Sequence, residues 1–506
     1  MTTNPFKKIF TGMNSSSFSQ QFKPFALKME AQNMPPIVIN VFKYYYYLMV
    51  SGASGKIPER DISPLSDTEL DSYSDLSEYE GPGRNALSET VMIKLNGGLG
   101  TSMGLKKAKS LLPAKNGMTF LDIILNQTGA LREETGTQIP LLFMNSFNTH
   151  SETMMQLVGF DNGPSDLPLA FLQHKYPKVL QKDYSPAAWP QNPELEWNPA
   201  GHGDIYTSLV TSGMLDRLLQ AGYKYAFISN VDNLGAVMDE KILGYMAENK
   251  LPFVMEVADR TPADRKGGHL ARLNNGRLVL REIAQCPESD LNSFYDIKRH
   301  RFFNTNSIWL DLRVLERVFV YNRMMPLDLI INPKTIDPRN SKSPGVYQLE
   351  TAMGSAVSAF YDATAVRVPR SRFAPVKTTD DLMAVMSDCY ILTDDFRVQS
   401  NPKRRRPIPE ISLDSRFYKK IDDFQVRFPI DMPSMLECES LRISGDVSFS
   451  RDVALKGNVA IENETEHQLV VTPEMLENGG VVRVRPLEKE SSREDFQTVG
   501  EEEVVA

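Results

Sequence analysis

The chain has 506 residues, of which 41% are hydrophobic and 24% are charged. This is the composition of a globular protein, and the length predicts about three domains. The net charge of −8 gives no overall basic field that would gather nucleic acid, so we expect no nucleic-acid partner. A few local donors could still hold a small phosphate ligand.

The cysteines and the hydropathy pattern indicate the compartment. Cys286, Cys389 and Cys438 are far apart, odd in number and without a CxxC spacing, which favours a reducing compartment over a disulfide framework or a zinc site. No run of eighteen apolar residues occurs, so we expect no membrane span. The prediction is a cytoplasmic protein.

Residues 1–90 are predicted to form an N-terminal region of helical and irregular structure. Its start, with Lys7, Lys8, Lys23 and Lys28 among serines, is interpreted as a frayed, solvated tail, with a weak transit peptide as the alternative. Residues 38–50 predict a short amphipathic helix that docks on another element. Residues 63–80 are rich in Ser, Asp and Glu and predict a linker or loosely packed collar.

Residues 91–400 alternate short apolar segments with helical patterns, which predicts βαβ units and a mostly parallel sheet. Asn274-Asn275-Gly276 indicates a hairpin grafted onto that sheet. Asp204 and Gly222 suit the start and the end of one long helix. The expected strands are 91–95, 141–144, 169–173, 226–229, 253–257 and 365–368, and the expected helices are 119–131, 205–221, 239–248, 348–360 and 379–390.

Residues 401–506 have a different pattern. The basic run 403–406 is interpreted as a solvated linker. From Leu441 onward, short alternating segments recur, and Gly445 and Gly457 lie twelve residues apart. This predicts a small β domain, as a few coils of a β-helix or as a small irregular sheet. Its stacking edges suggest a homo-oligomer contact, and the acidic end at 501–503 is predicted to be disordered.

A glycine loop, KLNGGLGTSMG at residues 94–104, follows the first predicted strand. Four glycines allow the backbone to approach an anion and to turn its N–H groups toward it. The dinucleotide fingerprint would need glycine where Met103 stands, and a P-loop would need lysine where Leu105 follows Gly104. A dehydrogenase and a P-loop kinase are therefore excluded.

The loop is followed by Lys106, Lys107 and Lys109-Ser110, and then by NGMTFLD at residues 116–122. Together these strings resemble the signature of the UTP–glucose-1-phosphate uridylyltransferases, or UDP-glucose pyrophosphorylases, over roughly residues 91–390. The resemblance implies an α/β, GT-A-like (Rossmann-type) nucleotidyltransferase core with a mixed, mostly parallel sheet. It also implies a small C-terminal β-helix domain and Mg²⁺ as cofactor.

The implied reaction is an in-line attack by a sugar-phosphate oxygen on the α-phosphorus of UTP. A phosphate monoester has a second pKa of about 6 and is mostly a dianion at neutral pH, so it needs no general base. The site should instead supply positive charge and hydrogen-bond donors. The chain has only six histidines and no HExxH motif, which agrees with this mechanism.

By resemblance, Lys109 contacts the triphosphate, with Lys106 in reserve because Lys107-Ala108 replaces the Gly-Pro common in the family. Lys377 approaches the phosphates from across the cleft, and both Lys109 and Lys377 are predicted to be catalytic. Gln173 reads the uracil edge, since an amide offers both a donor and an acceptor. The predicted nucleotide-binding set is Leu95, Asn96, Gly97, Gly98, Lys109, Gln173, Gly201, Asn230 and Lys377.

Asp232 follows the predicted strand 226–229, at the end where open α/β sheets place their ligands. One carboxylate together with substrate phosphates suits Mg²⁺, so Asp232 is the predicted metal ligand. Residues 201–204 open a predicted helix, whose free N–H groups suit an anion. The sugar-phosphate set implied by the resemblance is His202, Glu256, Gly268, Glu282, Asn304, Thr305 and Asn306.

The predicted function is transfer of uridylyl from UTP to glucose 1-phosphate, giving UDP-glucose and pyrophosphate. One alternative is the same chemistry on another sugar, by a UDP-N-acetylhexosamine or broad-specificity UDP-sugar pyrophosphorylase. An alternative of another class is a non-catalytic sugar-nucleotide-binding protein. The presence of Lys109, Lys377, Asp232 and His202 together argues against this last possibility.

Overall fold

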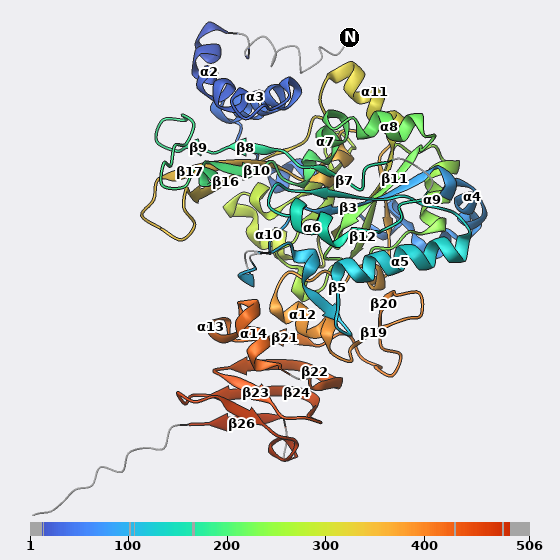
Figure 1. Ribbon diagram of the computed structural model, residues 1–506, viewed down its shortest axis with the longest axis vertical. Helices are drawn as coiled ribbons and strands as arrows, with labels where there is room; N and C mark the ends of the chain where they lie inside the picture. Colours follow the sequence, from blue (N-terminus) through green and yellow to red (C-terminus); the bar gives the residue numbers. More distant parts are fainter. Residues whose placement is uncertain are drawn as a thin grey trace, which may run out of the picture.

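The computed structural model describes residues 13, 15–100, 103–105, 107–163, 167–429, 432–477 and 480–485. Its main sheet has the strand order β2-β18-β12-β15-β11-β3-β6-β7 (Figure 1). Along this path β15 is antiparallel to both neighbours and every other pairing is parallel, which confirms the mixed, mostly parallel sheet. The strands are β2 (Asp71–Ser72), β3 (Thr90–Asn96), β6 (Leu141–Asn145), β7 (Ala170–Leu172), β11 (Tyr225–Asn230), β12 (Phe253–Asp259), β15 (Phe302–Asp311) and β18 (Thr364–Arg367).

Helices cover both faces of this sheet. Along β3, Met92 packs into the cluster that contains α5 (Phe120–Thr135) and α9 (Glu240–Glu248). Val91 and Ile93 point to the opposite cluster, which contains residues of α7 (Ile205–Thr211), α8 (Met214–Gln220) and α11 (Leu312–Asn322). Burial on both faces explains why these strands are nearly continuous apolar runs.

Local signals set several elements as predicted. The hydroxyl of Thr119 accepts from the backbone N–H of Asp122, whose carboxylate accepts in return, and this capping box starts α5. The predicted hairpin is present as β13 (His269–Leu273) and β14 (Leu278–Arg281), with Gly276 at φ 86° in its turn. Both predictions are confirmed.

The single long helix predicted over 205–221 is wrong. The chain forms α7 and α8 separately, because Gly213 adopts φ 71° between them and breaks the helical path. Asp204 precedes α7, yet its side chain accepts no capping hydrogen bond from the backbone N–H groups of the first turn. It binds His174 instead.

The helix predicted over 348–360 is also wrong. Residues Gly345–Thr351 form β17, which lies antiparallel between β16 (Leu329–Thr335) and β9 (Val179–Leu180), and a 3-10 helix Met353–Ser358 follows. Pairing with strands distant in sequence outweighs the helical periodicity. The helix predicted over 379–390 ends early, as α12 (Thr379–Met386), and Tyr390–Leu392 form β19.

In the N-terminal region, the helices α2 (Ser16–Glu30) and α3 (Pro36–Val50) lie at one end of the molecule in Figure 1. The docking helix predicted over 38–50 is confirmed. The solvated tail is wrong from residue 16 onward, because Phe18, Phe22 and Phe25 pack against Phe42 and Tyr46 of α3. Residues 1–12, with Lys7 and Lys8, lie outside the described part.

The segment predicted as a loose linker over 63–80 belongs to the main fold. β2 pairs with β18, while β1 (Ile62–Ser63) pairs with β13. Leu65, Leu70 and Leu76 are buried, and their packing fixes this otherwise polar stretch against the protein. Within the described ranges, no helix is long and apolar enough to cross a bilayer.

The additional C-terminal β domain is confirmed. β21 (Glu410–Ser412), β22 (Ser434–Ser444), β24 (Ala454–Asn463) and β26 (Val481–Val484) pair in parallel, and so do β23 (Val447–Phe449) and β25 (Leu469–Val471). Leu441 pairs with Val459, a separation longer than the twelve residues between Gly445 and Gly457. That twelve-residue step is therefore not the structural repeat.

The basic run 403–406 is not entirely solvated. Arg404 is only 7% exposed, and its guanidinium donates to backbone carbonyls of Pro407, Met435, Leu436 and Cys438. This side chain ties the run to β22. The acidic end at 501–503 lies outside the described residues.

The two glycines of the C-terminal domain give a test of its packing. Both have positive φ, and alanine there costs about 1–2 kcal/mol. A Cβ at Gly445 would also lie 2.0 Å from the carbonyl oxygen of Asn463, whereas one at Gly457 meets nothing within 4 Å. We expect Gly445→Ala to lower the thermal unfolding temperature clearly more than Gly457→Ala. Equal shifts in a calorimetric comparison would contradict this packing.

Candidate functional site

An ion pair brings together three segments that are distant in sequence, at the carboxyl ends of the central strands β3 and β11. Nζ of Lys109 lies 2.7 Å from Oδ2 of Asp232 and also donates to the carbonyl of Val376. The backbone N–H of Lys109 closes the glycine loop onto the carbonyl of Gly98 at 3.2 Å. The glycine loop, the end of β11 and the segment before Lys377 therefore meet at this point.

The neighbouring strands β3 and β11 explain why these groups share one edge. They run parallel, with Leu95 opposite Asn230, so their carboxyl ends coincide. Leu95 itself is buried. The side chain of Asn96 is also buried and donates to Asn145 and Thr153, both at 2.8 Å. The side chains of Leu95 and Asn96 thus pack and bond within the fold and fix the strand end.

Gln173 lies between the glycine loop and the turn before α7. Its Nε2 donates to the carbonyl of Gly201 at 2.7 Å. A Cβ at Gly97 would lie 2.5 Å from its Oε1, and a Cβ at Gly201 (φ 86°) would lie 2.4 Å from the carbonyl of Thr351. The backbone contact requires glycine at position 201, whereas a Cβ at position 97 would push the end of the Gln173 side chain aside. A Cβ at Gly98 meets nothing within 4 Å.

His202 is held as a neutral donor. Its Nδ1 accepts the backbone N–H of Met353 at 3.0 Å, so the single proton of the neutral ring is on Nε2. Burial and, to a smaller extent, the positive charge of Lys377 lower the pKa of His202 to about 4. At neutral pH the ring can donate one hydrogen bond and cannot take up a further proton.

Lys377 lies near the residues predicted for the sugar. Its Nζ is 5.6 Å from the ring centroid of Phe303. Burial raises the pKa of Glu282, and the charge of Lys377 opposes this shift. Gly268 packs on Glu282, since a Cβ at Gly268 would lie 2.5 Å from its carboxylate oxygen. His202, Gly268, Glu282 and Lys377 therefore form one neighbourhood.

A β-bulge in β15 turns Asn306 toward the end of β11. The register with β12 shifts between Val257, opposite Asn304, and Glu256, opposite Ser307. Asn306 adopts φ 58°, and its Nδ2 donates to Oδ1 of Asn230 at 2.9 Å. Its own Oδ1 is buried without a hydrogen-bond partner, and such a group at a bulge is typical of a binding site.

The comparisons with known proteins agree with this geometry. The family model of UTP–glucose-1-phosphate uridylyltransferase matches residues 39–456. The chain belongs to the UTP–glucose-1-phosphate uridylyltransferase family. The family enzyme of Solanum tuberosum is 42% identical over 393 residues, which are 77% of this chain and 80% of the relative. That of Musa acuminata is 40% identical over 434 residues, 85% and 91% of the two chains.

Solved structures of the same family share the fold. A mutant form of the UDP-glucose pyrophosphorylase of Leishmania major, in complex with UDP-glucose, has a TM-score of 0.84 at 40% identity. The match covers 92% of this chain and 98% of that one. A Trypanosoma brucei structure described as UDP-glucose phosphorylase has a TM-score of 0.85 at 42% identity, covering 92% and 100%.

Two of the residues that the family resemblance suggested for the sugar are engaged elsewhere. Glu256 is fully buried, and its carboxylate accepts from Arg372 at 2.7 and 2.8 Å and from Trp309 at 2.9 Å. The hydroxyl of Thr305 donates to the backbone carbonyl of Glu256 at 2.8 Å. The structure brings neither side chain into the site. Lys106, the reserve lysine, lies outside the described residues.

A metal in this family member would have few protein ligands. Within the described ranges, no three or more His, Cys, Asp or Glu residues are grouped so that they could hold an ion. The side chain of Asp232 is 18% exposed, and one of its carboxylate oxygens is paired with Lys109. This arrangement fits Mg²⁺ that takes one carboxylate and completes its shell from substrate phosphates and water.

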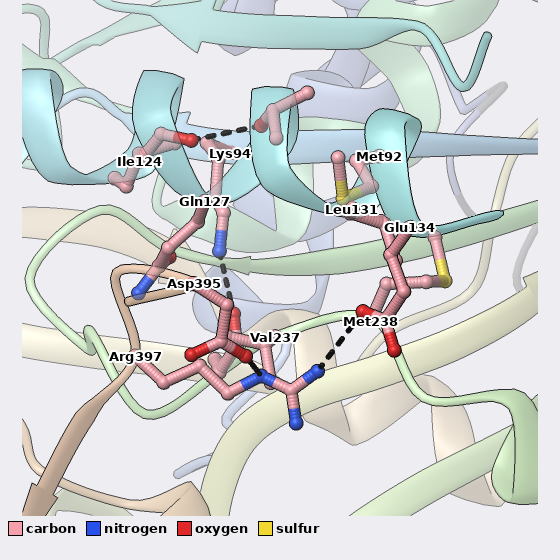
Figure 2. Close-up of a pocket in the computed structure, with 12 residues that line it drawn as sticks. Met92, Lys94, Ile124, Gln127, Leu131, Glu134, Val237, Met238, Asp395 and Arg397 are labelled. Carbon is pink, nitrogen blue, oxygen red and sulfur yellow. Dashed lines mark hydrogen bonds and ion pairs between the residues drawn. The ribbon is translucent and has the colours of Figure 1, made fainter. Parts of the chain in front are cut away.

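Sequence reasoning missed Lys94 as a supporting residue. It is 3% exposed and donates to the hydroxyl of Ser229 and the carbonyl of Ala236, both at 2.8 Å. Burial lowers its pKa to about 7. Figure 2 shows it lining a pocket with Gln127 and Arg397. At about 30 Å³ this pocket holds only water. The sequence signal that could have identified Lys94 is the presence of a lysine inside an otherwise apolar strand.

The contact between Gly97 and Gln173 gives a test of the nucleotide side. Gly97→Ala should displace the Gln173 amide and weaken UDP-glucose binding by about 10- to 100-fold, as expected for a misplacement of this size. Gly129→Ala, within α5 where a Cβ meets nothing, is the matched control and should leave affinity unchanged. Titration calorimetry measures both. Wild-type affinity in Gly97→Ala would refute the placement of Gln173.

Proposed function

We propose that the chain transfers the uridylyl group of UTP to glucose 1-phosphate, giving UDP-glucose and pyrophosphate. Family membership across residues 39–456 supports this reaction. The convergence of Lys109, Asp232 and the Val376–Lys377 segment at one sheet edge carries the proposal. Such a cluster suits a triphosphate better than it suits a neutral ligand.

In the proposed mechanism the protein binds, orients and neutralises charge. The glycine-loop backbone and Lys109 hold the triphosphate, while Gln173 pairs with the uracil edge. Nε2–H of His202 donates to the sugar phosphate. Because Nδ1 of His202 already accepts from Met353, the ring cannot act as a base. The dianionic phosphate attacks without one, and Lys377 stabilises charge in the transition state.

Asp232 is the proposed ligand of Mg²⁺. The bound ion would neutralise phosphate charge and orient the α-phosphate for in-line attack. Asn230 and Asn306 hold each other at 2.9 Å beside it, which keeps the strand end rigid while the ion and the nucleotide bind.

Glucose is the proposed sugar, and a UDP-N-acetylhexosamine or broad UDP-sugar specificity is the alternative. Gly268 packs directly on the carboxylate of Glu282, and the family resemblance assigns both residues to the sugar. A panel of hexose 1-phosphates separates these possibilities. The proposed location is the cytoplasm, with no nucleic-acid or membrane partner.

Homo-oligomerisation through the C-terminal domain is a further part of the proposal. β26 ends the order β21-β22-β24-β26, and Val481 at its start is 60% exposed. An edge strand with exposed apolar side chains favours pairing with another copy. Light scattering of the full chain measures the oligomeric state.

Asp232→Asn tests the metal assignment. The substitution should leave the fold intact and reduce pyrophosphate release from UTP and glucose 1-phosphate by orders of magnitude, because the metal ligand is lost. Asp446→Asn is the matched control, since Asp446 is similarly exposed at 22% and pairs with Arg427 at 2.9 Å. The control should retain activity. A wild-type rate in Asp232→Asn would disprove the assignment.

The pH profile tests the absence of a general base. We expect kcat/KM for glucose 1-phosphate to fall below about pH 6, where the substrate becomes a monoanion. His202 titrates near pH 4 and is neutral across this range, so it does not cause the fall. In His202→Gln the rate should be lower and the inflection unchanged. An inflection that moves or disappears in this variant would assign the titration to His202.

A further inference from the structure

A buried pair of charges connects the segment after β7 with the turn before α7. The Asp204 side chain is fully buried, and its Oδ2 and Oδ1 lie 2.9 and 3.1 Å from Nδ1 of His174. Oδ2 also accepts the backbone N–H of His174 and the hydroxyl of Ser208, both at 2.6 Å. The carboxylate is thus held by donors from two separate elements.

The neighbours of His174 fix its protonation state. Thr211 donates its hydroxyl hydrogen to the carbonyl of Thr207 at 2.9 Å, so at 3.1 Å from Nε2 of His174 it accepts. Nε2 therefore carries a hydrogen, and so does Nδ1, which faces the Asp204 carboxylate. With both nitrogens protonated the ring is an imidazolium. Burial would lower the pKa of His174, but Asp204 more than offsets this, and the pKa is raised.

This ion pair lies beside two groups assigned to the nucleotide. Gln173 immediately precedes His174, and its amide donates to Gly201 at 2.7 Å. The backbone N–H of Ala200 donates to the carbonyl of His174 at 3.2 Å. The two segments are therefore joined both by the buried charges and by hydrogen bonds beside them.

We propose that the His174–Asp204 ion pair is a positioning device that holds Gln173 and Gly201 at the spacing that accepts the uridine nucleotide. The inference rests on the proposed function, because it takes Gln173 and Gly201 as nucleotide contacts. Neither charged residue touches the substrate in this proposal. Their effect reaches the nucleotide through the adjoining backbone.

A buried charged pair suits a positioning role because the hydrogen bonds around the carboxylate allow only one arrangement of the two segments. Removing two charges from water costs about as much as their attraction returns, so such a pair adds little net stability. Replacing the Asp204 carboxylate by an amide keeps its shape but removes the negative charge and sets an NH₂ group against a donor of His174 or of Ser208. The segment that carries Gln173 then loses its fixed partner.

Asp204→Asn is the direct test. UDP-glucose affinity, measured by titration calorimetry, should fall by about 10- to 100-fold. KM for UTP should rise with it, while kcat at saturating UTP changes less, because Lys109, Asp232 and Lys377 are untouched. The matched control is Asp311→Asn, since Asp311 is 5% exposed and pairs with Arg313 at 2.6 Å. The control should keep wild-type affinity for UDP-glucose.

Two further variants make every outcome decisive. Thr211→Val removes the acceptor of Nε2–H together with the hydroxyl's own bond to the carbonyl of Thr207. It leaves the Asp204 contact in place, so it should weaken UDP-glucose binding in the same direction by a smaller factor, and it serves if Asp204→Asn does not fold. Gln173→Ala tests the site itself. If Gln173→Ala weakens binding while Asp204→Asn and Thr211→Val do not, the positioning role is overturned and the proposed function stands. If Gln173→Ala binds UDP-glucose normally, the nucleotide site is misplaced, and both the positioning role and the proposed function are contradicted.

Discussion

The site depends on the contact between Lys109 and Asp232, 2.7 Å apart. Lys109 ends the glycine loop, and Asp232 follows the central strand β11. The carbonyl of Val376 accepts a hydrogen bond from the same ammonium group. One cation thus sets the distance between the glycine-loop backbone, the proposed metal ligand and the segment that carries Lys377. A lysine among these acceptors is also preorganised to meet the charge of a triphosphate.

Two histidines near this point are held in opposite protonation states by their surroundings. His202 is neutral, because burial and Lys377 disfavour its charge and a backbone N–H occupies Nδ1. His174 is charged, because Asp204 lies against one nitrogen and Thr211 accepts from the other. In the proposed function the neutral ring offers a donor to the substrate, and in the proposed positioning role the charged ring holds the adjoining segments. Local electrostatics alone distinguishes their roles.

Sequence predicted the elements that depend on local patterns. The apolar strands β3 and β11, the helix α5 and the Asn-Asn-Gly hairpin were all predicted from neighbouring residues. The helix predicted over 348–360 failed because β16 and β9 pair with that segment from distant parts of the chain. The resemblance assigned Glu256 to the sugar. Neighbouring residues could not show that Glu256 pairs with Arg372, because Arg372 lies more than a hundred residues away.

The glycine loop and Asp232 were predicted from their places after strands of the sheet, and the family resemblance supplied the roles predicted for Gln173 and His202. The supporting residues Lys94, His174 and Asp204 could not be predicted, because their partners follow only from the fold. A crystal structure with UTP and Mg²⁺ bound tests the account most directly. We predict that the triphosphate lies against Gly97, Gly98 and Lys109 with the ion on Asp232. A nucleotide bound away from these residues would contradict it.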